Sequence, residues 1–153
     1  MVLKTSFVKA FFSFISLSIL IIAVSSYFVF DKKLIGFLFL GLGVINLIIL
    51  KFFKINIKAI YPDVIFGAID NGILVFAAVF GANFAGVAGA IIGGAAGNTI
   101  TDGIGGLFEG YVAEQQRKDK VNNKRTALSS SLGKMTGCLF GAGIGLILVW
   151  FIL

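Results

Sequence analysis

The chain has 153 residues, of which 58% are hydrophobic and 13% are charged, and its mean hydropathy is +1.03. A soluble domain carries about 25% charged residues, so the composition excludes an ordinary soluble enzyme or binding module and indicates an integral membrane protein. The net charge is +6, but the basic residues lie between apolar runs. This placement is explained by membrane topology, so no nucleic-acid partner is predicted. The chain has no His, and no Ser or Cys stands beside a plausible base, so no enzymatic activity is expected.

The first half of the chain contains two long apolar runs. Residues 10–30 form the first expected span. This run also resembles a signal peptide with a cleavage site near residues 23–25, but it is longer than the usual apolar region of 7–15 residues, so an uncleaved helix is expected. After a short turn, residues 34–50 form the second span, in which several glycines are interspersed.

The second half contains three more runs. Pro62 is expected to open a helix over residues 63–82, because a proline costs nothing at the first helical position. A turn at residues 81–83 leads to a fourth span over residues 85–113. Residues 114–132 are polar and basic, and residues 133–153 form the last span. The fold expected is therefore an all-α membrane protein, a single domain of five transmembrane helices.

The basic residues predict the orientation of these spans. Eleven of the 13 Lys and Arg fall on the side of the N-terminus and of residues 114–132, and Lys32 and Lys33 fall on the other side. Basic residues concentrate in cytoplasmic loops. The N-terminus and the 114–132 loop are therefore expected in the cytoplasm, and the C-terminus outside or in a lumen.

Four acidic residues lie within the third and fourth spans. A rise of 1.5 Å per residue places Asp70 about 12 Å and Asp102 about 15 Å deep, near the middle of a bilayer core about 30 Å thick. Asp63 and Glu109 lie nearer the cytoplasmic surface. No Lys or Arg is expected at these depths, so two facing pairs are predicted, Asp70 with Asp102 and Asp63 with Glu109. Facing carboxylates in a low dielectric must bind a cation, hold protons or exchange one for the other.

The candidate site contains oxygen ligands only. Asn71 follows Asp70, and Asn98 shares a helix face with Asp102 and Glu109. Carboxylate and amide oxygens suit Mn²⁺, Mg²⁺ or Ca²⁺ and accept Fe²⁺. Structural interpretations remain open. In these interpretations, Asp63 stabilises a helix N-terminus, and Glu109 is solvated at the interface. Asp70 and Asp102 are protonated hydrogen-bond donors between helices, and Asn71 and Asn98 bridge helices.

Glycines repeat along the last two spans. Gly86, Gly89, Gly93 and Gly97 form one stripe, and Gly137, Gly141 and Gly145 form another. Small residues at such spacing let two helices approach closely. Both stripes are expected to serve helix packing.

Two motifs resemble those of the vacuolar iron transporter family, which includes nodulin-like members. Residues 63–72 read DVIFGAIDNG, and the family carries a pattern like D-x-x-F-G-A-x-D-G. Residues 101–111 read TDGIGGLFEGY, and the family carries a pattern like A-D-G-x-S-M-x-x-x-E-Y. The resemblance covers residues 61–118, with two spans before the motifs and one after them.

The resemblance implies a dimer that moves Fe²⁺ or Mn²⁺ out of the cytoplasm against protons. It assigns Asp70 to the transport path through the first motif, and Asp102 and Glu109 through the second. The metal is the substrate, and no cofactor is expected. Two alternatives stay open: an ion channel or permease without proton coupling, and a structural membrane protein packed through its glycines without transport.

Overall fold

The structure of the protein, a computed structural model, describes residues 2–28, 32–118 and 126–152, and every element in them is α-helical. The four helices are α1 (Val2–Phe28), α2 (Lys32–Phe52), α3 (Ile57–Lys118) and α4 (Ala127–Ile152). Three apolar stretches of the described residues are long enough to cross a membrane: Leu34–Phe52, Ile57–Val112 and Ala127–Phe151. A shorter apolar stretch in α1 covers Phe11–Tyr27. The all-helical fold is confirmed, and these apolar helices are consistent with a membrane protein.

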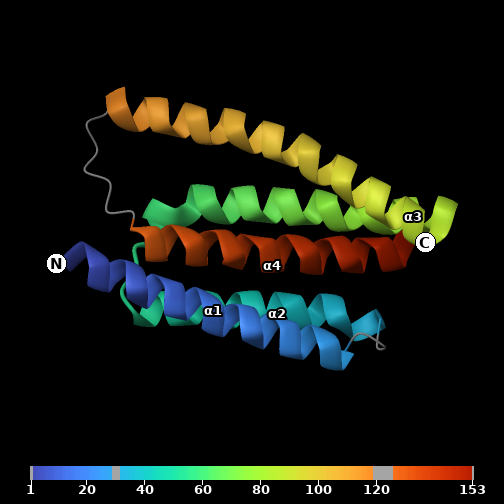
Figure 1. Cartoon of the computed structure of the whole chain (residues 1–153), viewed down its shortest axis with the longest axis horizontal. Helices are drawn as coiled ribbons and strands as arrows, with labels where there is room; N and C mark the ends of the chain where they lie inside the picture. The colour runs from blue at the N-terminus through green and yellow to red at the C-terminus, as the bar shows by residue number, and fades with distance from the viewer. Residues whose placement is uncertain (1, 29–31, 119–125, 153) are drawn as a thin grey trace.

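The long helix α3 bends back on itself at Ala85 and Gly86 (Figure 1). Gly86 has φ +57°, a conformation that glycine adopts without a steric penalty. The bend divides α3 into a first arm, residues 57–84, and a second arm, residues 87–118. The predicted spans over residues 63–82 and 85–113 therefore correspond to two helical arms that meet at a non-helical reversal, and the turn predicted at residues 81–83 was placed too early. Gly81 and Gly89 allow the crossing, because a Cβ on either would overlap the carbonyl oxygen of the other.

Helix α3 begins at Ile57, before the predicted proline. Asn56 caps it, since its Oδ1 accepts a hydrogen bond from the Lys58 N–H at 3.0 Å and its carbonyl accepts one from the Ala59 N–H at 2.9 Å. The prediction that Pro62 opens the helix was wrong. Pro62 lies inside the helix, where it has no N–H to donate to the carbonyl of Lys58.

Helix α4 also begins earlier than predicted, at Ala127 rather than at residue 133. Thr126 and Ser129 form a reciprocal cap: the Thr126 N–H donates to Ser129 Oγ at 2.9 Å, and the Ser129 N–H donates to Thr126 Oγ1 at 3.1 Å. At its other end, α3 extends to Lys118. The connection predicted over residues 114–132 is therefore shorter, and its residues 119–125 lie outside the described part.

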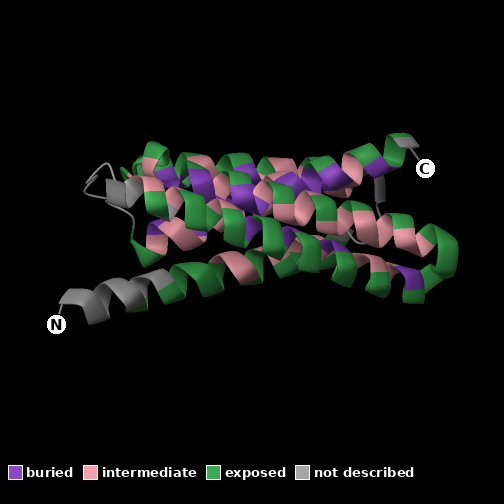
Figure 2. Ribbon diagram, turned by 90° about the horizontal axis from the view of Figure 1, so that it is seen from above, coloured by how far each residue is buried: buried purple, intermediate pink, exposed green. Residues whose placement is uncertain are grey.

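Helix α4 lies between the first arm of α3 and α2, and α1 packs on the outside of α2 and α4 (Figures 1 and 2). Glycines make this central position possible. A Cβ on Gly137 would overlap the carbonyl oxygen of Val64, and one on Gly141 would overlap that of Ala68. On the other side of α4, a Cβ on Gly143 would lie 2.8 Å from the carbonyl oxygen of Gly36. The packing role predicted for the α4 glycines is confirmed.

The second arm of α3 packs against the first arm through the predicted glycine stripe. A Cβ on Gly93 would overlap the Ala77 carbonyl oxygen, and one on Gly97 would lie 3.0 Å from the Ala77 Cβ. Gly86 belongs to the bend and not to this stripe. The side of the second arm that points away from the first arm is uncovered: Val87 is 79% exposed and Leu107 is 78% exposed. This outer face is therefore free to contact lipid or another protein surface.

Candidate cation site

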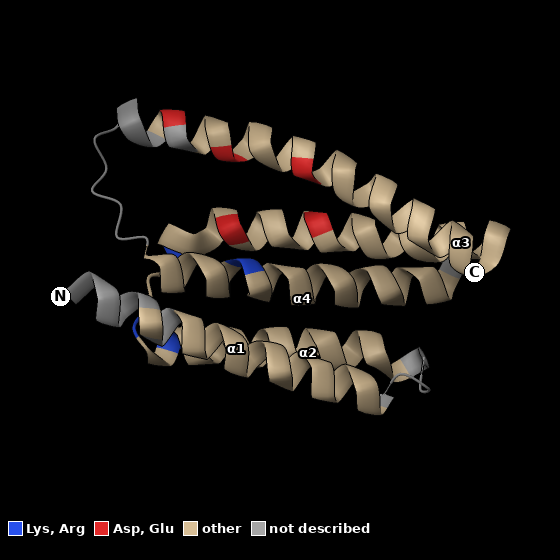
Figure 3. Cartoon of the chain, viewed as in Figure 1, with Lys and Arg blue, Asp and Glu red and all other residues tan. Residues whose placement is uncertain are grey.

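All acidic residues of the described part lie on α3 (Figure 3). Asp70, on the first arm, is half-buried and contacts the second arm through Thr101, whose Oγ1 donates to Asp70 Oδ1 at 2.5 Å. Thr101 is fully buried, and its hydroxyl also lies 3.1 Å from the Gly97 carbonyl oxygen and 3.0 Å from that of Asn98. This hydrogen bond thus links the two arms of α3 near the middle of each arm.

Asp102 does not take the position opposite Asp70 that the sequence predicted. Thr101 contacts Asp70, and the next side chain along a helix points about 100° away. Asp102 is exposed, and its Oδ2 accepts a hydrogen bond from Asn98 Nδ2 at 2.9 Å. The structure thus brings Asp102 and Asn98 together on the flank of the second arm.

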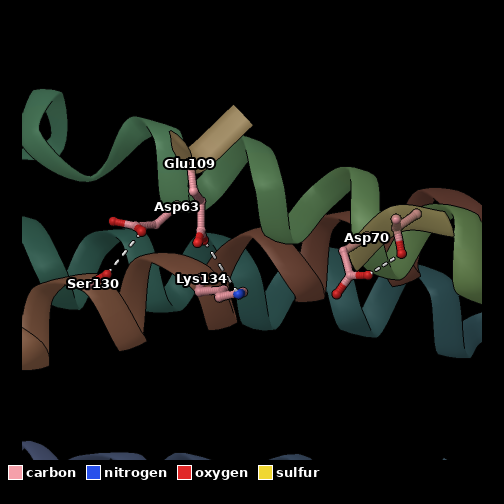
Figure 4. A network of polar contacts seen from close by, with 6 residues as sticks. Asp63, Asp70, Glu109, Ser130 and Lys134 are labelled. Carbon is pink, nitrogen blue, oxygen red and sulfur yellow. Dashed lines mark hydrogen bonds and ion pairs between the residues drawn. The ribbon is translucent and has the colours of Figure 1, made fainter. Parts of the chain in front are cut away.

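Glu109 has a basic partner that the sequence analysis excluded. Lys134 Nζ, on α4, lies 3.8 Å from Glu109 Oε1 and 4.1 Å from the centroid of the Phe66 ring (Figure 4). The side chains of Lys134 and Glu109 are 45% and 56% exposed. The prediction of no Lys or Arg beside the carboxylates was wrong because α4 begins at Ala127, which places Lys134 two turns inside the helix.

Asp63 belongs to the contact between the first arm and α4. It is 5% exposed, and its Oδ1 accepts a hydrogen bond from Ser130 Oγ at 2.9 Å (Figure 4). Because α3 begins at Ile57, Asp63 stands in the second turn, so the interpretation that placed it at the helix N-terminus was wrong. Asn71 also points towards α4, where its Nδ2 donates to the Cys138 carbonyl oxygen at 3.4 Å. Both residues link helices.

Within the described residues, no group of three or more His, Cys, Asp or Glu could hold a metal ion. One copy of the chain thus supplies separate carboxylates: Asp70 behind Thr101, Asp102 on an exposed flank, and Glu109 beside Lys134. The arrangement in one copy can hold protons or bind a cation weakly, but it offers no complete coordination shell.

The residues that partner the carboxylates, namely Thr101, Ser130 and Lys134, were not predicted from the sequence. A polar contact inside the bundle was not predicted either. Asn46, on α2, is 3% exposed, and its Nδ2 donates to Thr136 Oγ1 on α4 at 2.6 Å. A signal for this contact was present, since Asn46 is the one polar residue in the apolar run 34–50.

Comparisons of the chain with family models, with curated proteins and with solved structures found no match. The resemblance to vacuolar iron transporters therefore stays a prediction from the two motifs.

Proposed function

We propose that two copies of this chain form a divalent cation transporter that exports Fe²⁺ or Mn²⁺ from the cytoplasm in exchange for protons. The cation passes along the exposed flank of the second arm of α3, where Asn98, Asp102 and Glu109 supply oxygen ligands. Asp70 lies behind this path and is linked to the second arm by the hydrogen bond from Thr101. The two motifs that resemble vacuolar iron transporters support the same assignment.

Five membrane crossings per copy fit the lengths of the helices. The apolar stretch Ile57–Val112 has 56 residues and would measure about 84 Å if it were straight, nearly three times the bilayer core. Bent at Gly86, it provides two crossings. The stretch Phe11–Tyr27 has 17 residues, at the lower end of what spans a bilayer. With α2 and α4, these give five.

The exposure of Asp102 is the observation that carries the proposal. Asp102 lies inside an apolar arm, ten residues before the end of its apolar stretch at Val112. A carboxylate facing lipid at this depth costs roughly 2.5–3.5 kcal/mol on insertion scales, and such residues almost always face a bundle interior or a water-filled path. Neither α4 nor the first arm covers it, so a second protein surface is required.

A second copy fits the same flank. Gly103, Gly106 and Gly110 are three and four residues apart, so they share one side of the second arm. A Cβ on any of them would meet nothing within 4 Å, so this side is open to a neighbouring helix. A twofold contact presents each side chain twice. Two copies of Asp102 and two of Glu109 would then provide two carboxylate pairs about 10 Å apart along the arm, and carboxylate oxygens suit Mn²⁺ or Fe²⁺.

Lys134 accounts for entry into this path. Its ion pair with Glu109 is partly exposed, and such pairs contribute about 0–1 kcal/mol. A divalent cation carries twice the charge and can displace the ammonium group from Glu109. Glu109 then forms the cytoplasmic entrance. When no metal is present, Lys134 neutralises the charge of Glu109.

Flux measurements in proteoliposomes test the proposal. Purified wild-type protein should move Fe²⁺ or Mn²⁺, and a pH gradient should accelerate the flux in one direction. Asp102→Asn should abolish flux in a folded protein, because it keeps the size and removes the charge. Glu109→Gln should weaken entry. Glu114→Gln is the matched control: Glu114 is an exposed carboxylate of the same arm beyond the apolar stretch, so its flux should equal that of the wild type.

The other outcomes separate the alternatives. Flux that ignores the pH gradient would identify a channel or permease. If the wild type moves none of Fe²⁺, Mn²⁺, Mg²⁺ and Ca²⁺ under either gradient, transport is wrong and a structural protein packed through glycines remains. Gly106→Leu tests the second copy separately, because a large side chain on the open flank should convert the dimer to a monomer. A wild type that is already monomeric in mild detergent and in bilayers contradicts the shared path.

A further inference from the structure

A second feature of the molecule lies away from the carboxylates, on the side where α1 packs. A cavity of about 760 Å³ opens between α1, the end of α2 and the start of α4. Its walls are mainly apolar, with Phe12, Leu17 and Leu20 from α1 facing Ile49 and Leu132 from α2 and α4. The hydroxyl groups of Ser13 and Ser16 also line it. Its volume is in the range of ordinary ligand sites, about 300–1,000 Å³.

A smaller and more polar cavity adjoins this one. It has a volume of about 200 Å³ and is lined by Lys54, Asn56, Thr126 and Ser129. Ile55 lines both cavities, so the apolar cavity and the polar cavity share a wall. Together they offer hydrocarbon on one side and hydrogen-bonding groups on the other.

The short connection from α2 to α3 is basic. Lys51, Lys54 and Lys58 are all exposed in and beside the short connection from α2 to α3. Residues 32–62 contain no Asp or Glu, and the next residue, Asp63, is buried and accepts a hydrogen bond from Ser130. Figure 3 shows the basic residues of the described part in this half of the bundle, together with acidic residues of α3. The polar cavity therefore complements an anion.

We propose that these two cavities bind one anionic phospholipid of the surrounding bilayer, with an acyl chain in the apolar cavity and the phosphate group beside Lys54. The site lies where α2 ends and where α3 and α4 begin, which is the level of the lipid headgroups if these helices cross the membrane. The apolar cavity requires a hydrocarbon chain, which a free phosphate lacks. This site uses no residue of the cation path and stands independently of transport.

Purified full-length protein in mild detergent, incubated with phosphatidylglycerol or phosphatidylcholine and analysed by native mass spectrometry, tests the proposal. The wild type should retain one phosphatidylglycerol and should bind phosphatidylcholine at least tenfold more weakly. Lys54→Gly removes the charge without straining the backbone, because Lys54 has φ +56° and glycine adopts this conformation freely. It should weaken phosphatidylglycerol binding about fivefold, and the double variant with Lys51→Ser about 25-fold.

Two further variants separate charge from shape. Ser16→Phe fills the apolar cavity from an exposed position of α1 and should weaken the binding of both lipids. Lys33→Ser removes a positive charge at the start of α2, the opposite end from Lys51, and should change neither. Equal retention of the two lipids by the wild type, or full retention of phosphatidylglycerol by the Lys51/Lys54 double variant, would overturn the proposal. Circular dichroism confirms folding, and if Ser16→Phe does not fold, the lysine variants decide alone.

Discussion

The contact between α4 and the first arm of α3 leaves no room for a methyl group, and this makes its strength measurable. A Cβ on Gly141 would overlap the carbonyl oxygen of Ala68, a backbone atom that a rotamer change cannot move away. Gly141→Ala therefore forces the two helices apart. Overpacking of this kind costs about 1–3 kcal/mol.

The intrinsic preference of the helix acts in the opposite direction. Alanine is about 0.8–1.0 kcal/mol more favourable than glycine in a helix interior. Gly41→Ala is the matched control, because Gly41 lies within α2, is exposed, and a Cβ there would meet nothing within 4 Å. The propensity term is common to both variants. Gly141→Ala should therefore be less stable than Gly41→Ala by about 1–3 kcal/mol.

The assay is unfolding in mixed micelles with a rising fraction of denaturing detergent. Trp150, the one tryptophan of the chain, lies on α4 and reports its separation from the bundle by fluorescence. Far-ultraviolet circular dichroism follows the helices in parallel. If Gly141→Ala unfolds at the same detergent fraction as Gly41→Ala, the close contact between α4 and α3 is wrong.

Two further predictions concern α4. Asn46→Ala and Thr136→Val should each destabilise the bundle, and a double-mutant cycle should give a coupling of about 0.6–1.7 kcal/mol, as for hydrogen bonds between membrane helices; additive effects would contradict the bond. A reporter inserted within residues 119–123 should be cytoplasmic and one after Leu153 external, because the basic residues favour that orientation; both reporters on one side would contradict five crossings.

The helical class of the protein was predictable because it depends on composition and on continuous apolar runs. The position of the bend was not. Gly81, Asn83 and Gly86 can each end a helix, and local propensity does not choose among them. The choice depends on the close crossing of Gly81 over Gly89, which is a tertiary contact. The prediction thus placed the turn three or four residues too early.

The helix boundaries could have been predicted more closely. Asn56 before α3 and the Thr126–Ser129 pair at the start of α4 are ordinary capping residues, and they mark these starts better than Pro62 or the hydropathy of residues 133–153 does. The error at α4 affected the site directly. A helix that begins at Ala127 places Lys134 two turns into α4, where it meets Glu109.

The candidate site was predictable in its residue types but not in its pairing. Spacing along a helix indicates which carboxylates share a side, but the rotation of one helix against another is set by packing. Here Phe66 packs against Gly105, and a Cβ on Gly105 would overlap the Phe66 ring. That contact turns Thr101 towards Asp70 and leaves Asp102 beside it. The periodicity of the sequence does not determine this rotation of one arm against the other.

The central position of α4 has a consequence for the order of assembly. This helix follows in the chain all three helices that it contacts. During synthesis the two arms of α3 can close on each other as soon as residue 118 has left the ribosome. The faces of α2 and of the first arm that receive α4 remain open until the last helix is inserted. A chain interrupted before Ala127 keeps its hairpin but lacks the helix that joins this hairpin to α1 and α2. The bundle is therefore completed by its final segment.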